Sequence, residues 1–336
     1  MKLFVSAGIR EADFEKDAHG ALAVLDLETG KKEVVYKVFP HPFALRSENP
    51  RGGTRGYRGL TLKKNKVIVA SNDSINFYDK ALNYQMSITH PSFGNLHGLS
   101  HGWGDCILAV STVNDTWSVI DLKRGSTKIY EPLDNPEVYQ LLSPLLKLRG
   151  RDRKPFDSTH DYRERHIEDV LHFNTLIQVG CNVYGMFNSI HTVIQFYPKP
   201  KIIWAPPLEW KDFIPAWGQD KYQGLGIKSP HDLIPWRGRL LINSSGDQRL
   251  VALDPQTGEL ETIYNLSIKN REGWTRGLDV IEDTALVGDG DGGVSFIDLR
   301  KRALLERRQI FDPVENKECA IYGVACEGGF HDGKTK

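Results

Sequence analysis

The chain has 336 residues, and its 43 Lys and Arg residues are balanced by 43 Asp and Glu residues, so the formal net charge is zero. Hydrophobic residues make up 40% of the sequence and charged residues 26%, which excludes a disordered chain and allows a full buried core. The lack of a basic surplus argues against nucleic-acid or anionic-membrane partners, because binding to either needs a positive surface.

Segments that direct a chain to or through a membrane are not expected. No apolar run approaches the roughly 18–20 residues of a transmembrane helix. The apolar stretch Leu3–Ala7 is too short for the core of a signal peptide. The four cysteines show neither a CxxC spacing nor a compact disulfide framework. We therefore expect a reduced, cytoplasmic protein.

An internal repeat organises the chain, and it begins with a short motif that ends in an apolar residue. Each internal copy continues with an apolar strand, a polar turn, a third strand that often ends in an acidic residue, and a fourth strand. In chain order the motif occurs at Tyr57–Leu60, Leu96–Leu99, Phe173–Leu176, Pro230–Leu233, Thr275–Leu278 and Ile321–Val324. The copy at Phe173 is the most diverged.

The two ends of the sequence complement each other. The N-terminal segment, KLFVSAG followed by ALAVLDLETG and KKEVVYKVF, supplies three strands without a first one, whereas Ile321–Val324 supplies a first strand alone. This pattern predicts an all-β fold, a six-bladed β-propeller with four antiparallel strands per blade. The C-terminal strand would close the ring by pairing in the N-terminal blade, over a single domain of residues 1–336. A β-sandwich with chance similarity between its segments is the alternative.

Three long insertions interrupt the repeat, at residues 39–56, 132–172 and 206–229. All three connect a fourth strand to the next first strand, which places them on one face of the predicted disc. Long loops in a compact fold are usually functional or disordered. We expect them to form a lid over the mouth of the central channel, and part of the second insertion to be a short helix.

One repeat position, directly before the Gly-Leu or Asp-Leu pair in most copies, predicts the functional site. Equivalent positions in equivalent strands point the same way, so these side chains should converge in the channel. Around the ring the position is occupied by Arg58, His97, Asn174, His231, Arg276 and Tyr322. Spacing alone selects Asn174 rather than the nearby His172. Polar groups buried in a channel need partners, so we expect a ligand site, a water-filled channel being the alternative.

The order of these residues divides the ring into two halves. Arg276, Tyr322 and Arg58 form one half, which suits the binding of a carboxylate or phosphate because guanidinium groups bind such groups bidentately. His97, Asn174 and His231 form the other half.

The histidine half has two interpretations. His97 and His231 could act as acid–base catalysts together with Tyr322, while Asn174 joins the arginines in binding substrate. They could instead hold one divalent metal ion with Asn174, and a carboxylate from Asp232, Glu168 or Asp161 would strengthen this metal site. No nucleotide cofactor is expected, because neither a Walker loop nor a GxGxxG turn between a strand and a helix is present.

At the level of the blade pattern, nearly the whole chain resembles the broad group of six-bladed propellers that includes gluconolactonase-like, strictosidine synthase-like and NHL-repeat proteins. Gluconolactonase-like members hold a central divalent metal with Glu, Asn and Asp residues. Here Asn174 alone matches that set, and the remaining ring positions carry His, Arg and Tyr, which argues against calcium-dependent lactone hydrolysis.

The sequence leads us to expect an enzyme that acts on a small anionic metabolite in the channel, by hydrolase, lyase or isomerase chemistry. The alternative is a non-catalytic propeller that binds a protein or a small ligand. Neither the substrate nor the oligomeric state follows from the sequence.

Overall fold

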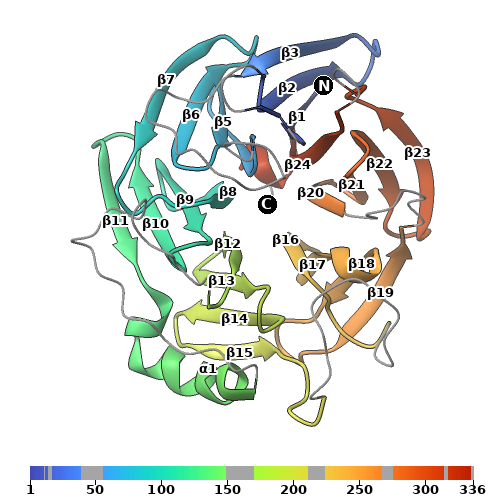
Figure 1. The fold of residues 1–336 in the computed structure, drawn as a ribbon. Helices are drawn as coiled ribbons and strands as arrows, with labels where there is room; N and C mark the ends of the chain where they lie inside the picture. The colour runs from blue at the N-terminus through green and yellow to red at the C-terminus, as the bar shows by residue number, and fades with distance from the viewer. Residues whose placement is uncertain are drawn as a thin grey trace.

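The repeated apolar segments pair as antiparallel strands, and the strands assemble into blades around one axis (Figure 1). The computed structural model describes residues 1–10, 12–13, 17–38, 56–148, 170–210, 224–266, 275–313 and 317–333. Within these residues there are six four-stranded sheets, one for each predicted blade. The predicted fold class, a six-bladed β-propeller, is confirmed.

Each sheet runs from an inner strand at the axis to an outer strand at the rim. The first two sheets are β24 (Cys319–Cys326), β1 (Lys2–Ile9), β2 (Gly20–Asp26), β3 (Lys32–Val38), and β4 (Leu60–Lys63), β5 (Lys66–Ala70), β6 (Ser74–Asp79), β7 (Tyr84–Thr89). The next two are β8 (Leu96–His101), β9 (Cys106–Ser111), β10 (Thr116–Asp121), β11 (Ser126–Tyr130), and β12 (Phe173–Val179), β13 (Asn182–Phe187), β14 (Thr192–Tyr197), β15 (Lys201–Trp204). The last two are β16 (Pro230–Trp236), β17 (Arg239–Ser244), β18 (Arg249–Leu253), β19 (Leu260–Asn265), and β20 (Thr275–Ile281), β21 (Thr284–Asp289), β22 (Gly293–Asp298), β23 (Ala303–Gln309).

The ring closes as the sequence predicts, because β24 is the inner strand of the sheet that begins the chain. It pairs antiparallel with β1, with Val324 opposite Val5 and Ala320 opposite Gly8. In Figure 1 this red strand lies between the axis and the blue strands β1 to β3. Closure leaves no open edge at the junction of the two chain ends.

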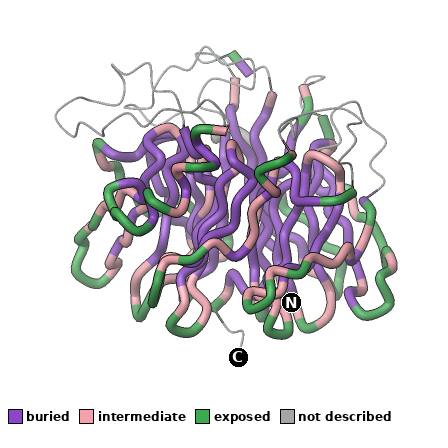
Figure 2. Tube along the Cα trace, turned by 90° about the horizontal axis from the view of Figure 1, so that it is seen from below, coloured by how far each residue is buried: buried purple, intermediate pink, exposed green. Residues whose placement is uncertain are grey.

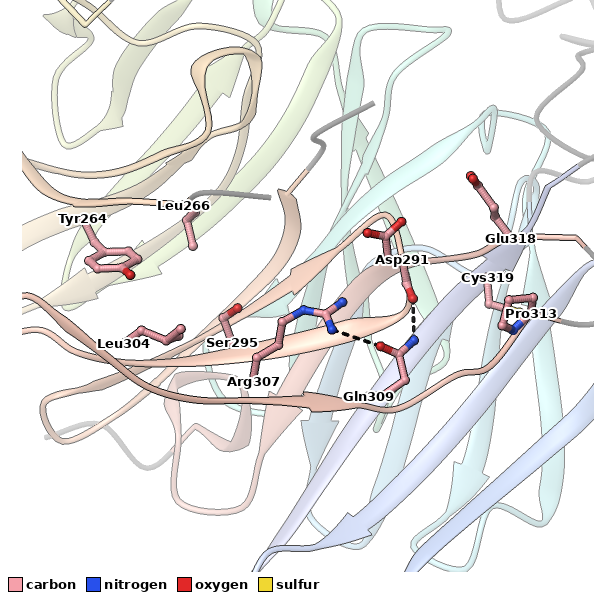
Figure 3. Close-up of a pocket in the computed structure, with 10 residues that line it drawn as sticks. All are labelled: Tyr264, Leu266, Asp291, Ser295, Leu304, Arg307, Gln309, Pro313, Glu318 and Cys319. Carbon is pink, nitrogen blue, oxygen red and sulfur yellow. Dashed lines mark hydrogen bonds between the residues drawn. The ribbon is translucent and has the colours of Figure 1, made fainter. Parts of the chain in front are cut away.

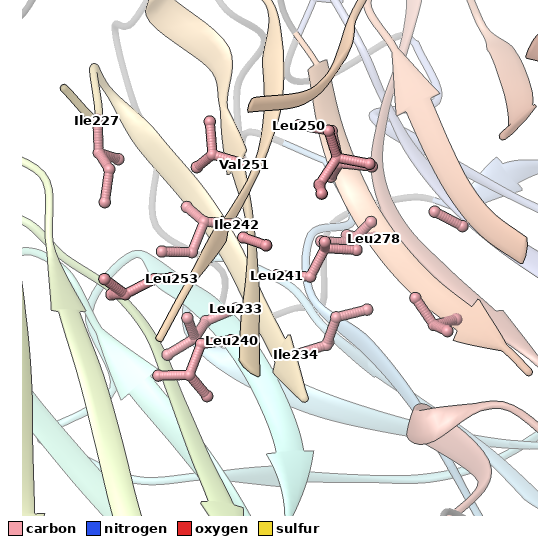
Figure 4. Close-up of a cluster of buried hydrophobic side chains, with 14 of the residues drawn as sticks. Ile227, Leu233, Ile234, Leu240, Leu241, Ile242, Leu250, Val251, Leu253 and Leu278 are labelled. Atoms are coloured by element: carbon pink, nitrogen blue, oxygen red, sulfur yellow. The ribbon is translucent and has the colours of Figure 1, made fainter. Parts of the chain in front are cut away.

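The hydrophobic core lies within the blades and between neighbouring blades. Figure 2 shows buried residues along the strands and exposed residues at the turns. One cluster, drawn in Figure 4, joins Leu233 of β16, Ile242 of β17 and Val251 of β18 to Leu278 of the next blade. Because every blade packs against two neighbours in this way, the inner strands are fixed at equivalent heights around the axis.

The acidic residues that end many third strands have a structural role. In each case one carboxylate oxygen accepts hydrogen bonds from backbone N–H groups of the following turn, which fixes the connection to the fourth strand. These residues are Asp26, Asp79, Asp121, Asp254 and Asp298.

The described part of the second insertion packs at the rim of the disc. It contains a 3-10 turn, Pro132–Asp134, and helix α1, Pro136–Leu148, which confirms the predicted short helix. Asn135 caps the helix by accepting hydrogen bonds from the N–H groups of Glu137 and Val138. Helix α1 lies beside β15, away from the axis (Figure 1), and its buried leucines join the core of that blade. Residues 132–148 therefore do not cover the channel.

Other parts of the predicted lid, residues 39–55, 149–169 and 211–223, lie outside the described residues. No helix in the described ranges is long and apolar enough to cross a membrane.

Candidate functional site in the central channel

A β-bulge presents the ring residue in each inner strand. In β16, for example, His231 pairs with Asn243 and Leu233 pairs with Ile242, so Asp232 is an extra residue. Equivalent register shifts occur at His97, Asn174, Arg276 and Tyr322. Ahead of β4, Arg58 and Gly59 both hydrogen bond to Ala70, which is the same two-to-one arrangement. A bulge bends a strand and turns a side chain away from the regular alternation, here into the channel.

Crowding at the axis explains the glycine that follows several ring residues. A Cβ atom on Gly59 would lie 2.5 Å from the carbonyl oxygen of His97 in the next blade. A Cβ atom on Gly323 would lie 2.6 Å from the carbonyl oxygen of Arg58. Glycine therefore occurs in the Gly-Leu pair of the repeat because neighbouring inner strands approach closely at this position.

The arginine half of the ring is assembled around one phenol. The guanidinium carbon of Arg58 lies 5.2 Å from the centre of the Tyr322 ring, and that of Arg276 lies 4.8 Å from it. All three residues are buried, with Arg58 only 2% exposed and Arg276 6% exposed. Two permanent positive charges are thus held close together in a site with little access to water, where electrostatic interactions are strong.

The histidine half contains three rings. The ring centres of His97 and His231 are 5.6 Å apart, and the centre of His172 lies 6.1 Å from that of His97. His231 is oriented through Nδ1, which lies 2.8 Å from the carbonyl oxygen of Ser229 and 3.0 Å from the Ser245 hydroxyl. His172, the alternative to Asn174 in the sequence, therefore lies beside His97.

Asn174 joins the two neighbouring blades beneath these rings. Its side-chain amide donates a hydrogen bond of 2.7 Å to the carbonyl oxygen of Pro230, the residue before His231. The side chain is completely buried, and its Oδ1 atom has no hydrogen-bond partner among the described atoms. Asn174 therefore positions His231 and keeps an acceptor available at the site.

The electrostatic environment keeps the histidines neutral. Burial lowers the pKa of His97 well below its usual value, and the charges of Arg58 and Arg276 lower it further. Burial, followed by Arg276, lowers the pKa of His231 in the same way. Both imidazoles are consequently able to accept a proton at neutral pH.

The lower end of the channel is closed by a segment that the repeat did not predict. A 3-10 helix, Phe330–Asp332, follows β24 and carries His331 to the axis. The carbonyl oxygen of His331 accepts hydrogen bonds from the Thr61 hydroxyl and from His101, and its N–H donates to Asp279. Because this segment lies beyond the last strand of the repeat, its position could not be read from the periodicity.

A small cavity remains between this 3-10 helix and the ring. Its volume is about 10 Å³, room for about one water molecule, and its lining includes Asp232, Tyr322 and His331. This cavity is therefore too small for a ligand larger than water.

The predicted metal site has no additional support. Among the described residues, no group of three or more His, Cys, Asp or Glu side chains has an arrangement that could hold a metal ion. Two of the carboxylates considered as further ligands, Asp161 and Glu168, lie outside the described residues. The third, Asp232, lies one residue beyond His231 and lines the small lower cavity. The set of His97, Asn174 and His231 remains a prediction.

A larger cavity of about 590 Å³ lies away from the axis, between β19 and the outer strands β22 and β23 (Figure 3). Its polar groups largely bind one another: Arg307 donates to Gln309, and Gln309 donates to the carbonyl oxygen of Asp291. None of the ring residues lines it. The channel therefore remains the candidate site.

Comparison with known proteins supports the fold. No protein-family model matches the chain, and no curated protein matches its sequence. Among solved structures, a chain in a crystal structure of a nidogen/laminin complex is 13% identical, with a TM-score of 0.56, and the match covers 96% of this chain and 97% of that one. A catalytically inactive virginiamycin B lyase from Staphylococcus aureus, crystallised with quinupristin, is 11% identical, with a TM-score of 0.49, and the match covers 91% and 85% of the two chains.

Similarity at this level of identity concerns the fold alone. The resemblance inferred from the blade pattern is confirmed at that level, and the chain is a six-bladed β-propeller.

Proposed function

We propose that the protein is an enzyme that acts on a small anionic metabolite, one bearing a carboxylate or phosphate, in the upper part of the central channel. The observation that carries this proposal is the burial of Arg58 and Arg276 close to the same Tyr322 ring. Holding two guanidinium groups together in a site of low dielectric is unfavourable, and a bound anion would offset their repulsion.

The neutral histidines supply the reactive groups in this proposal. Burial, and after it the positive charges that favour an anion, lowers the pKa of His97, so its imidazole is unprotonated near neutral pH and can act as a general base. His231 is held in one orientation by Ser229 and Ser245, as a catalytic imidazole requires. The hydroxyl of Tyr322, whose ring lies near both arginines, would donate or accept the second proton. Hydrolysis, elimination and isomerisation all need such a pair of groups.

A resident metal ion fits less well than an anion. His97, His231 and the Oδ1 atom of Asn174 would be its ligands, and the metal would supply a Lewis acid when bound. The charges that lower the pKa of both histidines also oppose a divalent cation at the same place. We therefore propose acid–base chemistry by the side chains themselves, and elemental analysis of the purified protein tests this choice.

A non-catalytic propeller is the second candidate. A chain of similar fold comes from a structure of a nidogen/laminin complex, and this supports considering a binding role. In that case the ring residues would bind a ligand without transforming it.

Substitution of the histidines distinguishes the two candidates. The purified protein would be screened for turnover of carboxylate- and phosphate-bearing esters, lactones and hydroxy acids. We expect His97→Ala and His231→Ala to abolish the turnover found while leaving the folded structure intact, and Arg58→Ala mainly to raise KM. His90→Ala, outside the ring, serves as the matched control. Turnover that survives both histidine substitutions would overturn the assignment of these residues as catalysts.

A further inference from the structure

The residue two positions before the ring residue has a left-handed backbone in four blades. These residues are Gly56, Asn95, His172 and Ser229, with φ values of 66°, 52°, 52° and 41°. Glycine adopts this conformation without cost, whereas a residue with a Cβ atom is disfavoured in it. Because the turn recurs in blades with different residues, it belongs to the fold. What distinguishes the fourth of the sheets described above is the imidazole that its turn carries.

Backbone contacts on both sides fix the turn at His172. The N–H groups of Val170 and Leu171 each donate a hydrogen bond of 2.8 Å to Oδ2 of Asp115, which lies in the turn between β9 and β10. The N–H group of Asn188 donates a hydrogen bond of 3.0 Å to the carbonyl oxygen of His172. Two neighbouring blades therefore determine where this histidine lies.

His172 is the most exposed of the three imidazoles in the histidine half. Its ring meets that of His97 edge-on, with the ring centres 6.1 Å apart. His97 is 9% exposed and His231 only 3%, whereas His172 is half-buried. His172 also directly precedes β12, so it lies on the face from which the inner strands start. It is thus placed beside the buried histidines on the side of the site nearest to solvent.

Resting on the anion site proposed above, we propose that His172 is a substrate-binding residue, which hydrogen bonds a hydroxyl group of the substrate and so selects hydroxy acids. The arginine half of the ring takes the anionic group, and a molecule that also reaches the histidine half needs a second group that imidazole recognises. Imidazole nitrogens donate or accept hydrogen bonds according to the protons they carry, and a hydroxyl can do either. Asp115 is a positioning residue in this proposal, because it acts through His172.

The test compares acids that differ only in a hydroxyl group. Glycolate and acetate form a short pair, and malate and succinate form a longer one. Dissociation constants would be measured at one fixed pH by ligand-observed nuclear magnetic resonance, which detects weak binding. In at least one pair we expect the hydroxy acid to bind about tenfold more tightly, because the hydroxyl gains a hydrogen bond in a partly buried site.

Two substitutions remove the imidazole without straining the turn. His172→Gly and His172→Asn introduce residues that the structure already holds in the left-handed conformation at Gly56 and Asn95, so both variants should fold. Both should lose the preference for the hydroxy acid and bind the acids without a hydroxyl as before, since the asparagine side chain is too short to replace imidazole. Glu282→Gly changes an exposed residue with a φ of 53° and should keep the preference.

Substitution of Asp115 tests its positioning role. Asp115 itself has a φ of 50°, so Asp115→Gly removes the carboxylate without straining the backbone. This variant should lose most of the preference for the hydroxy acid. Asp115→Asn should keep it, because the amide oxygen can accept the hydrogen bonds from Val170 and Leu171. An equal loss in both variants would overturn the role of Asp115.

The outcomes separate this inference from the proposed function. A preference for the hydroxy acid that persists in His172→Gly would assign the hydroxyl to another residue, such as His97, and would overturn the role of His172. Binding of all four acids that depends on Arg276, but shows no preference in the unaltered protein, would also overturn it and leave the anion site standing. The absence of binding by all four acids would overturn the anion site and this inference together.

Discussion

The side-chain amide of Asn174 donates a hydrogen bond of 2.7 Å to the carbonyl oxygen of Pro230, across the boundary between two blades. Pro230 directly precedes His231, so the orientation of one ring residue depends on the side chain of another. Because Asn174 is fully buried, this contact is protected from competition by water. The positions of the ring residues Asn174 and His231 are therefore coupled by this hydrogen bond.

Removing that hydrogen bond should weaken both the fold and the site. We expect Asn174→Ala to reduce the free energy of unfolding by about 1–3 kcal/mol, because a buried carbonyl oxygen loses its donor. Urea denaturation measures this change. Asn83→Ala, which removes an exposed amide that donates to Asp79, should cost less than about 1 kcal/mol. Equal costs for the two substitutions would contradict the role assigned to Asn174.

The arginines should control the protonation of His97. Substituting Arg58→Gln or Arg276→Gln removes a positive charge that lowers the pKa of His97, so this pKa should rise in each variant. It should remain below the usual value, because burial is the larger cause of the shift and persists. Titration of the His97 ring by nuclear magnetic resonance measures the effect. Arg237→Gln, half exposed and paired with Asp283, should leave the value unchanged.

The buried groups at the lower end of the channel should make stability depend on pH in opposite directions. Burial lowers the pKa of His331 to about 3, so the unfolded chain binds the proton more readily, and this residue makes stability fall as the pH drops below about 6.5. Burial raises the pKa of Asp279 to about 7, so the folded chain binds the proton more readily, and this residue makes stability fall as the pH rises from about 4 to about 7.

Two single variants separate these contributions. Between about pH 4 and pH 6.5, His331→Gln should flatten an increase of stability with pH, and Asp279→Asn should make it steeper, by up to about 1.4 kcal/mol per pH unit in each case. The backbone hydrogen bonds of His331 are retained in the first variant. Urea denaturation across this range measures both slopes, and slopes that change in the same direction would refute the assignment.

The glycines beside the ring should tolerate no side chain. In Gly59→Ala the new Cβ atom would lie 2.5 Å from the carbonyl oxygen of His97 and 2.6 Å from the backbone nitrogen of Leu99, so the backbone must move. We expect a loss of more than about 2 kcal/mol together with altered anion binding. In Gly30→Ala the new Cβ atom would have no other atom within 4 Å. This substitution should cost only the ~1–2 kcal/mol needed to hold an alanine in the left-handed conformation. Thermal denaturation compares the two variants.

Much of the fold could be predicted from the repeat. The motif from Thr275 to Leu278 and its relatives identified the inner strands, and the incomplete N-terminal copy identified β24 as the closing strand. Equivalent strands impose equivalent geometry, and in the structure Arg58 and Arg276 both lie near Tyr322, while His97 lies near His231.

Features that depend on long-range packing were not predictable in this way. The bulges at the ring residues were not predicted, because the register of a strand depends on the strand it pairs with. His172 lies outside the repeat motif, and its ring comes close to that of His97 only in the folded chain. A short helix was predicted in this insertion. Its position beside β15 was not predicted, because it depends on which apolar residues of the blade are left for the helix to cover. Asp232 stands where most copies of the motif have glycine, and its positive φ of 55° could not be read from the motif.

The closure of the ring by β24 also has a consequence for biosynthesis. Tyr322 is carried by β24, the strand that follows all the others in chain order, whereas Arg58 precedes most of them. A nascent polypeptide that has not yet released β24 from the ribosome can form most blades but cannot bring the two arginines onto the phenol. The proposed anion site is therefore completed in the same step that completes the disc.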